Sequence, residues 1–281
     1  MRALDLGFSS IGILSPFHVR DWDSAMGMLP REAISAIELF LPYPRGIRPG
    51  APCPFPLGSP SPDDKRDVVR YGTETILFAD ENGIRTVLVP PVRLDAELRQ
   101  SQLRLRKKRN VRDVLASLRT ARKSEAVARL DAFRSVLSRL LNVADRYGVR
   151  LVLIPGGWID ELPGAEEAAA CLQEFRGAPL GIWLDILGRA VALEVDAIST
   201  WAALEADLAG ATLSDHDEEL NEVPLGEGSL NWEEARELLQ KCPVWLVDSP
   251  RETAQGEGSK DIEFLEGLGR GPEKPGSLFA R

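Results

Sequence analysis

Short runs of apolar residues alternate along the chain with longer amphipathic segments, which is typical of βα units that build a parallel sheet. Seven of these runs predict strands, at 3–9, 35–41, 84–90, 149–155, 180–186, 210–215 and 243–248. An eighth strand is expected in the proline-rich stretch 51–57, although proline weakens a strand because it lacks the backbone donor. Eight such units predict an α/β fold of the (β/α)8 TIM barrel type.

Helical periodicity is clearest between residues 124 and 147, where apolar side chains recur at spacings of three and four. Ser124 suits the N-cap of this helix, and Gly148 suits the position just after its last turn. A second helix is predicted at 164–175, with two carboxylates in its first turn, where the helix dipole favours them. A third is predicted at 232–242, after a capping-box-like sequence.

The length of 281 residues fits one barrel domain, which takes about 250 residues. We expect a single domain at 1–268, with a long Pro-, Gly- and Ser-rich loop at 42–64 and a tail at 269–281. A basic helical insertion is expected near 96–123, because residues 96–129 hold eleven Lys and Arg against three acidic residues. It could clamp a sugar phosphate, contact nucleic acid, or form a solvated or subunit-contacting arm. We favour the arm, since charge runs are usually solvated faces.

The overall composition predicts a cytoplasmic protein. A net charge of −9 does not favour nucleic acid or an anionic membrane as partner. The three cysteines are odd in number and lack CxxC spacing, so neither a disulfide framework nor a structural zinc site is expected. No apolar stretch approaches the roughly 20 residues that span a bilayer.

Several motifs resemble those of one group of barrels. The segment EVPLGEGSLNWEEARELL at 222–239 resembles the PLGEG-x-x-x-W stretch that follows the seventh strand of the xylose-isomerase-like TIM barrels. In the right order around it, 33–42, 143–157 and 179–190 resemble that family's second, fifth and sixth strands, and the likeness covers most of 1–268. The resemblance is to the sugar phosphate isomerase/epimerase group. It implies isomerisation or epimerisation of a carbohydrate at the C-terminal mouth of the barrel, assisted by a divalent metal.

The metal-binding positions implied by this resemblance are largely replaced. The family supplies Glu, Asp, His and Glu on strands five to eight, where this chain has Ile154, Asp185, Thr212 and either Val247 or Asp248. Affinity for a hard divalent ion depends on how many charged ligands converge. We therefore predict a degenerate metal site and expect no metal cofactor. If the site were functional, Mn, Mg, Co or Zn would be held by Asp185, His216 and Asp248.

Candidate site residues lie where predicted strands end, because TIM barrels place their active sites at that face. Each has a structural alternative: the acids could cap loops, His216 could be an exposed loop histidine, and Trp158 could serve core packing. For Asp215 we favour the structural reading, in which it holds the following loop, and for His216 we favour the exposed loop histidine. The candidate catalytic residues are Glu38 and Asp185, and the candidate substrate-binding residues are Asp215, His216, Arg189 and Trp158.

Three functions follow from these observations. The first is a sugar phosphate isomerase/epimerase-like barrel that binds a small sugar, polyol or anion without the usual metal chemistry. The second is an active metal-dependent isomerase or epimerase with a rearranged site, in which Glu38 moves the proton. The third is a non-enzymatic scaffold that uses the basic arm. The sequence leaves open whether the protein is an enzyme, and a homodimer is compatible with all three.

Overall fold

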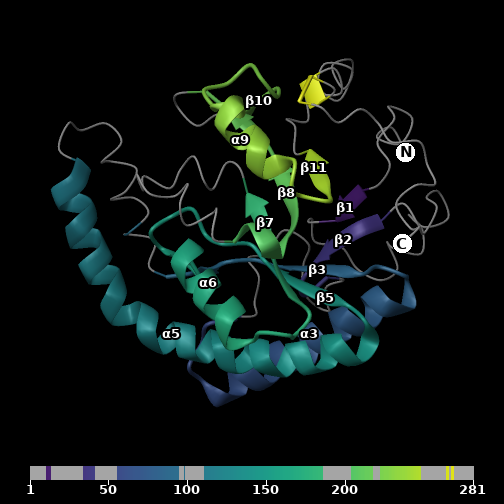
Figure 1. Cartoon of the computed structure of the whole chain (residues 1–281). Helices are drawn as coiled ribbons and strands as arrows, with labels where there is room; N and C mark the ends of the chain where they lie inside the picture. Colours follow the sequence, from purple (N-terminus) through teal and green to yellow (C-terminus); the bar gives the residue numbers. More distant parts are fainter. Residues whose placement is uncertain are drawn as a thin grey trace.

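A curled parallel sheet forms the centre of the computed structural model, which describes residues 11–13, 34–41, 56–94, 98, 111–185, 204–217, 222–247, 264–265 and 267–268 (Figure 1). Its seven strands pair in the order β1-β2-β3-β5-β7-β8-β11, and every neighbouring pair is parallel. The strands are β1 (Ile11–Ile13), β2 (Ile34–Glu38), β3 (Thr86–Val89), β5 (Arg150–Leu153), β7 (Leu180–Asp185), β8 (Leu208–Leu213) and β11 (Trp245–Val247).

Six of the predicted strands are confirmed, from β2 to β11. The run at 3–9 lies outside the described residues, and the first described strand is β1 instead. Of the strand expected at 51–57, residues 51–55 lie outside the described residues, and residues 56–57 are not in a strand. In the sheet, β2 pairs directly with β3, with Ile37 opposite Val87.

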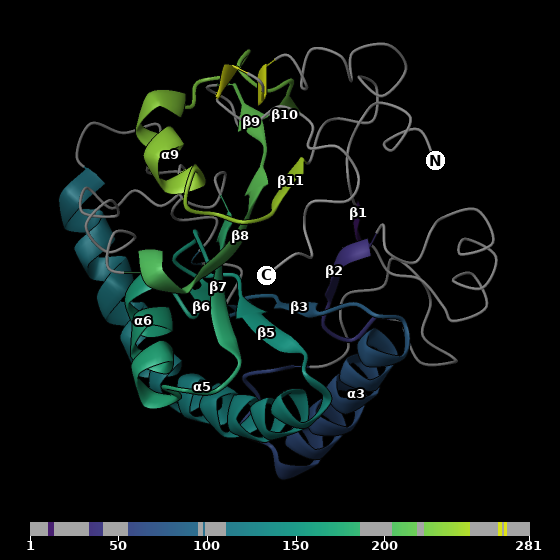
Figure 2. The ribbon, with the colours of Figure 1, turned by 45° about the vertical axis from the view of Figure 1, so that its right-hand side comes forward.

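Helices of the described part of the chain cover the outer side of the sheet (Figure 2). They are α3 (Pro62–Glu81), α5 (Val111–Tyr147), α6 (Ala165–Glu174) and α9 (Trp232–Leu239), and a 3-10 turn, η2 (Glu205–Asp207), precedes β8. The start of α3 corrects the predicted loop at 42–64. Ser61 caps this helix by accepting a hydrogen bond from the backbone N–H of Asp64, and proline at the first helical position has no N–H to leave unpaired.

Helix α5 is longer than its predicted span of 124–147, because it begins at Val111. Ser124 therefore lies inside the helix and not at its N-cap, which corrects that prediction. Lys and Arg are good helix formers, so the described part of the basic segment joins the amphipathic part without a break. The end is as predicted, since Gly148 has a φ of 62°. Within the described ranges, no helix has the length and apolar character of a membrane span.

Apolar side chains pack on both sides of the sheet. The larger cluster lies between the sheet and the helices and contains, for example, Ile37, Phe133 and Leu153. A smaller cluster lies on the inner side, and Trp183 is its largest member. Side chains alternate along a strand, so the inner cluster identifies which residues of each strand face the barrel interior. Its members are Ala36, Leu88, Val152, Trp183, Ala209 and Leu246, with Ile154 and Val244 packed against them.

Candidate functional site

The two candidate catalytic acids lie at the C-terminal ends of their strands, on the inner side of the sheet. Glu38 follows Ala36 by two residues on β2 and is paired in register with Leu88, and both of these neighbours belong to the inner cluster. Asp185 follows Trp183 by two residues and ends β7. In a TIM barrel this face carries the active site, so both acids stand at the mouth.

Glu38 lies in an apolar environment that disfavours its charged form. Its side chain is half-buried, and it makes no hydrogen bond or ion pair with another described residue. Burial raises the pKa of its carboxyl to about 7, because desolvation penalises the carboxylate. A carboxyl group with this pKa can both take up and release a proton near neutral pH.

The positions next to Asp185 lack metal ligands. Thr212 is paired with Asp185 in register, and its hydroxyl accepts a hydrogen bond of 2.8 Å from the indole Nε1 of Trp183. Ile154, at the end of β5, packs against the inner cluster. Gly210 makes room for the indole, because a Cβ there would lie 2.3 Å from Cζ3 of Trp183. One side of the mouth is therefore occupied by an indole, an isoleucine and a threonine.

Asp215 is buried and fully engaged by the protein. It lies in β9 (Asp215–His216), which pairs with β10 (Glu222–Val223) just beyond β8. One oxygen, Oδ2, accepts hydrogen bonds from the N–H groups of Gly226 (3.0 Å) and Gly228 (3.1 Å) and from Nε1 of Trp232 (3.0 Å). The other, Oδ1, accepts from the N–H groups of His216 (2.8 Å) and Leu230 (3.4 Å). Asp215 thus anchors the PLGEG loop and has no oxygen left to contact a substrate.

His216 is a buried residue, contrary to the expectation of an exposed loop histidine, because only 4% of its surface is exposed. Its Nδ1 lies 3.0 Å from Oγ of Ser229, in the loop that Asp215 anchors. Its other ring nitrogen, Nε2, is buried and has no hydrogen-bond partner among the described residues. No local sequence pattern indicates the contact with Ser229, since 13 residues separate the two.

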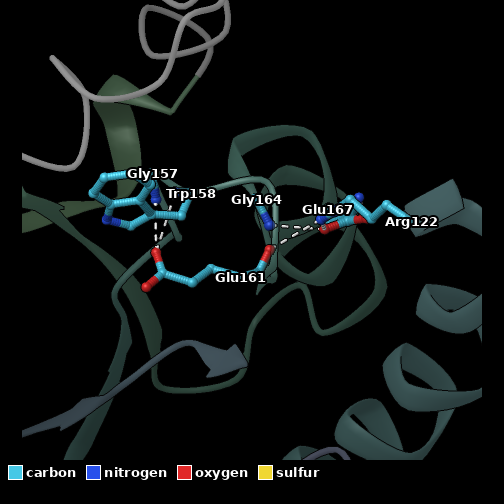
Figure 3. Close-up of polar contacts among 6 residues, drawn as sticks. All are labelled: Arg122, Gly157, Trp158, Glu161, Gly164 and Glu167. Carbon is cyan, nitrogen blue, oxygen red and sulfur yellow. Dashed lines mark hydrogen bonds and ion pairs between the residues drawn. The ribbon is translucent and has the colours of Figure 1, made fainter. Parts of the chain in front are cut away.

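Trp158 belongs to the loop between β5 and α6, and a buried glutamate in the same loop fixes its backbone (Figure 3). One oxygen of Glu161 accepts hydrogen bonds from the N–H groups of Gly157 (3.1 Å) and Trp158 (3.2 Å). Glu161 lies in β6 (Glu161–Leu162), which pairs with β4 (Val92–Arg93), and Arg93 lies 3.8 Å from its other oxygen. The sequence reasoning missed Glu161, because nothing near it along the chain indicates a buried carboxylate.

Arg122, a residue of the basic segment, supports this loop (Figure 3). Arg122 of α5 forms two hydrogen bonds of 2.7 Å with the carboxylate of Glu167, and a third of 3.0 Å with the carbonyl oxygen of Glu161. Glu167 also accepts a hydrogen bond from the N–H of Gly164, the N-cap of α6. Arg122 thus bonds to other residues of the protein, whereas its neighbour Lys123 is exposed to solvent.

Two of the candidate residues, Arg189 and Asp248, lie outside the described residues. The others are brought to the loops and strand ends on one side of the barrel, with Glu38 and Asp185 on the strands and Trp158 and His216 just beyond them. In the part of the chain that is described, no group of three or more His, Cys, Asp or Glu side chains could hold a metal ion.

Comparison with solved structures agrees with this architecture. A D-allulose 3-epimerase from Methylomonas, solved with D-allulose, is 12% identical over 95% of this chain and 88% of that chain, with a TM-score of 0.63. A xylose isomerase domain-containing protein from Salmonella typhimurium is 13% identical over 96% and 90%, with a TM-score of 0.60. A xylose isomerase-like TIM barrel protein from Mycobacterium smegmatis, solved with magnesium, is 13% identical over 95% and 85%, with a TM-score of 0.55.

The fold of this chain is therefore that of the xylose-isomerase-like TIM barrels, as the motifs predicted. At 12–13% identity the likeness extends to the fold and not to activity, which has to be argued from the site. Neither a protein-family model nor a curated protein matches the sequence.

Proposed function

We propose that this protein binds a small sugar, polyol or anion at the C-terminal mouth of its barrel, as a diverged sugar isomerase/epimerase-like protein whose metal site is degenerate. The observation that carries the proposal is the combination of a protonatable acid, Glu38, with non-ligating neighbours at the same mouth. Solved proteins of the same fold include one in complex with D-allulose, which supports a carbohydrate as ligand.

The loss of the metal site is supported by the residues themselves. An isoleucine at position 154 has no donor atom, and the hydroxyl of Thr212 already accepts a hydrogen bond from Trp183. A hard divalent cation needs several oxygen or imidazole donors around one point. Asp185 supplies a carboxylate, and Asp248, which lies outside the described residues, is the one other candidate at the family's metal positions. Two carboxylates are fewer donors than a divalent cation such as the magnesium in the Mycobacterium smegmatis barrel requires.

Trp158, His216 and Arg189 are the side chains proposed to contact the ligand. An indole can cover the apolar face of a sugar ring, while imidazole and guanidinium groups bind its oxygen atoms. Asp215, fully engaged by the loop, is proposed to position His216 and not to touch the ligand. The protein is expected to reside in the cytoplasm, and a homodimer is compatible with the proposal.

An active isomerase or epimerase is the second candidate function, and Glu38 favours it. Epimerisation beside a carbonyl requires a group that removes a proton from carbon and returns it, and a carboxyl with a pKa of about 7 can do both. In this alternative Asp185, His216 and Asp248 would bind Mn, Mg, Co or Zn.

Metal analysis and thermal unfolding test the proposal. Purified protein is expected to contain less than one equivalent of divalent metal, and Mn²⁺, Mg²⁺, Co²⁺ or Zn²⁺ is expected to leave the Tm unchanged. D-allulose at about 100 times its Kd should stabilise the native state by about 2.7 kcal/mol, which is several degrees in Tm. A metal-dependent rise in Tm that disappears in Asp185→Ala would replace the first function with the second.

A further inference from the structure

The strongest unexplained feature of the described molecule is the ring of His216. A buried polar atom without a partner costs about 1–3 kcal/mol, so proteins rarely keep one without a reason. Nε2 of His216 is such an atom, in a side chain that is 4% exposed. His216 lies three residues beyond Leu213, the last residue of β8, in a short strand held by the five hydrogen bonds to Asp215.

The contacts of Ser229 favour one tautomer of the His216 ring. The hydroxyl Oγ lies 3.0 Å from Nδ1 of His216 and also 3.0 Å from the backbone carbonyl oxygen of His216, which accepts from the backbone N–H of Ser229 as well (2.8 Å). A carbonyl oxygen can only accept, so both contacts of Oγ are hydrogen bonds only when the hydroxyl donates to the carbonyl oxygen. In that arrangement Nδ1 donates to Oγ. In the neutral ring this leaves Nε2 without a proton and with a lone pair that can accept a hydrogen bond.

The charges around the mouth indicate what kind of ligand would supply the donor. Glu38 and Asp185 are acidic, and an unprotonated Nε2 offers only a lone pair, so these groups recognise donors and not anions. Among the described residues, two basic side chains near the mouth loops are paired within the protein, Arg93 with Glu161 and Arg122 with Glu167, whereas Arg189 lies outside the described residues. A hydroxyl group fits both requirements, since it donates a hydrogen bond and carries no charge.

We infer that the mouth recognises an uncharged, polyhydroxylated ligand in preference to a phosphorylated one, and that Nε2 of His216 accepts a hydrogen bond from one of its hydroxyl groups. This inference rests on the proposed function and narrows it from sugars, polyols and anions to neutral sugars and polyols. Ser229 acts as a positioning residue, because it holds the ring in the tautomer that can accept.

The tautomer can be measured directly in the full-length protein. The chain has two histidines, His18 and His216, so a sample with ¹⁵N-labelled histidine gives two sets of ring signals, and His18→Gln assigns them. Long-range ¹H–¹⁵N correlation spectra should show His216 protonated at Nδ1 and unprotonated at Nε2. A ring protonated at Nε2 and not at Nδ1 would overturn the inference. Ser229→Ala should shift the ring toward the Nε2-protonated form, and an unchanged ring would also count against it.

Binding of D-allulose and of inorganic phosphate, measured by calorimetry, tests the ligand class. The wild type should bind D-allulose and show no binding of phosphate at the same concentration. His216→Asn keeps an amide near the place of Nδ1 but has no atom at Nε2, and its Kd for D-allulose should rise about tenfold, the usual effect of one hydrogen bond. His216→Gln can place its amide oxygen near Nε2 and should recover part of the loss. His18→Gln should bind like the wild type.

The outcomes distinguish a failure of the inference from a failure of the proposed function. If the wild type binds D-allulose and His216→Asn binds it as tightly, with a Tm within a few degrees of wild type, the inference fails and the proposed function stands. Tighter binding of phosphate than of D-allulose also overturns the inference alone. If the wild type binds neither probe, the proposed function fails and the inference fails with it.

Discussion

The carboxylate of Asp215 should be one of the most sensitive single groups for the stability of this protein. Asp215→Asn keeps the shape of the side chain and replaces one oxygen by an NH₂ group. In either orientation of the amide, at least two N–H groups lose their acceptor and face a donor instead, because each oxygen of Asp215 accepts at least two hydrogen bonds. The site is 1% exposed, so water cannot replace the lost acceptor.

The expected loss follows from those contacts. A hydrogen bond to a charged group contributes about 1.5–3 kcal/mol, and the 3.4 Å contact with Leu230 N–H is at the weak end. The substitution should therefore lower the free energy of unfolding by about 3 kcal/mol or more. For a chain of this size that is a fall in Tm of about 6–12 °C. A typical domain has about 5–15 kcal/mol in total, so the variant should still fold.

Urea unfolding followed by circular dichroism measures the change, with Asp131→Asn as the matched control. The side chain of Asp131 is 70% exposed and its nearest cation, in Arg134, is 3.9 Å away. The control should stay within about 0.5 kcal/mol of the wild type. A loss below about 1 kcal/mol in Asp215→Asn, at an unchanged slope against urea, would refute the reasoning that the loop depends on this carboxylate.

Three further predictions concern the barrel interior. Because burial raises the pKa of Glu38 from 4.5 to about 7, the unfolded chain ionises first. Stability should then fall by about 3 kcal/mol as the pH rises from about 4.5 to 7 and beyond, a fall that urea unfolding should not find in Glu38→Gln. Equal falls in both proteins would contradict this. Gly210→Ala brings a methyl group 2.3 Å from Trp183, and calorimetry should show a loss of about 1–3 kcal/mol from overpacking; a loss under 0.5 kcal/mol would contradict the packing. Ile154→Glu combined with Thr212→His should create a rise in Tm with Mn²⁺ that the wild type lacks, and no rise would show that other ligands are also missing.

The fold was largely predictable because a buried strand needs a run of apolar residues and leaves that run in the sequence. Six of the strands, from β2 to β11, follow such runs. Gly148 marks the end of α5 because the backbone there has a positive φ, which glycine adopts without strain. The start of α5 was placed too late. Val111, Val114, Leu115 and Leu118 already recur at helical spacing, but basic residues separate them from the apolar run after Ser124, where the N-cap was expected.

The sequence by itself determined which atoms are missing from the family's metal positions, since an isoleucine at 154 lacks a donor in any conformation. Tertiary structure decided the rest of the site. It showed that Asp215 is occupied by five N–H groups, that Arg122 of the basic segment reaches Glu167, and that one nitrogen of His216 is buried without a partner. Apart from the hydrogen bond between the neighbours Asp215 and His216, these contacts join residues 11 to 45 positions apart, or depend on burial from all sides. Local sequence patterns carry no information about such distances, because they arise only when the strands and helices pack together.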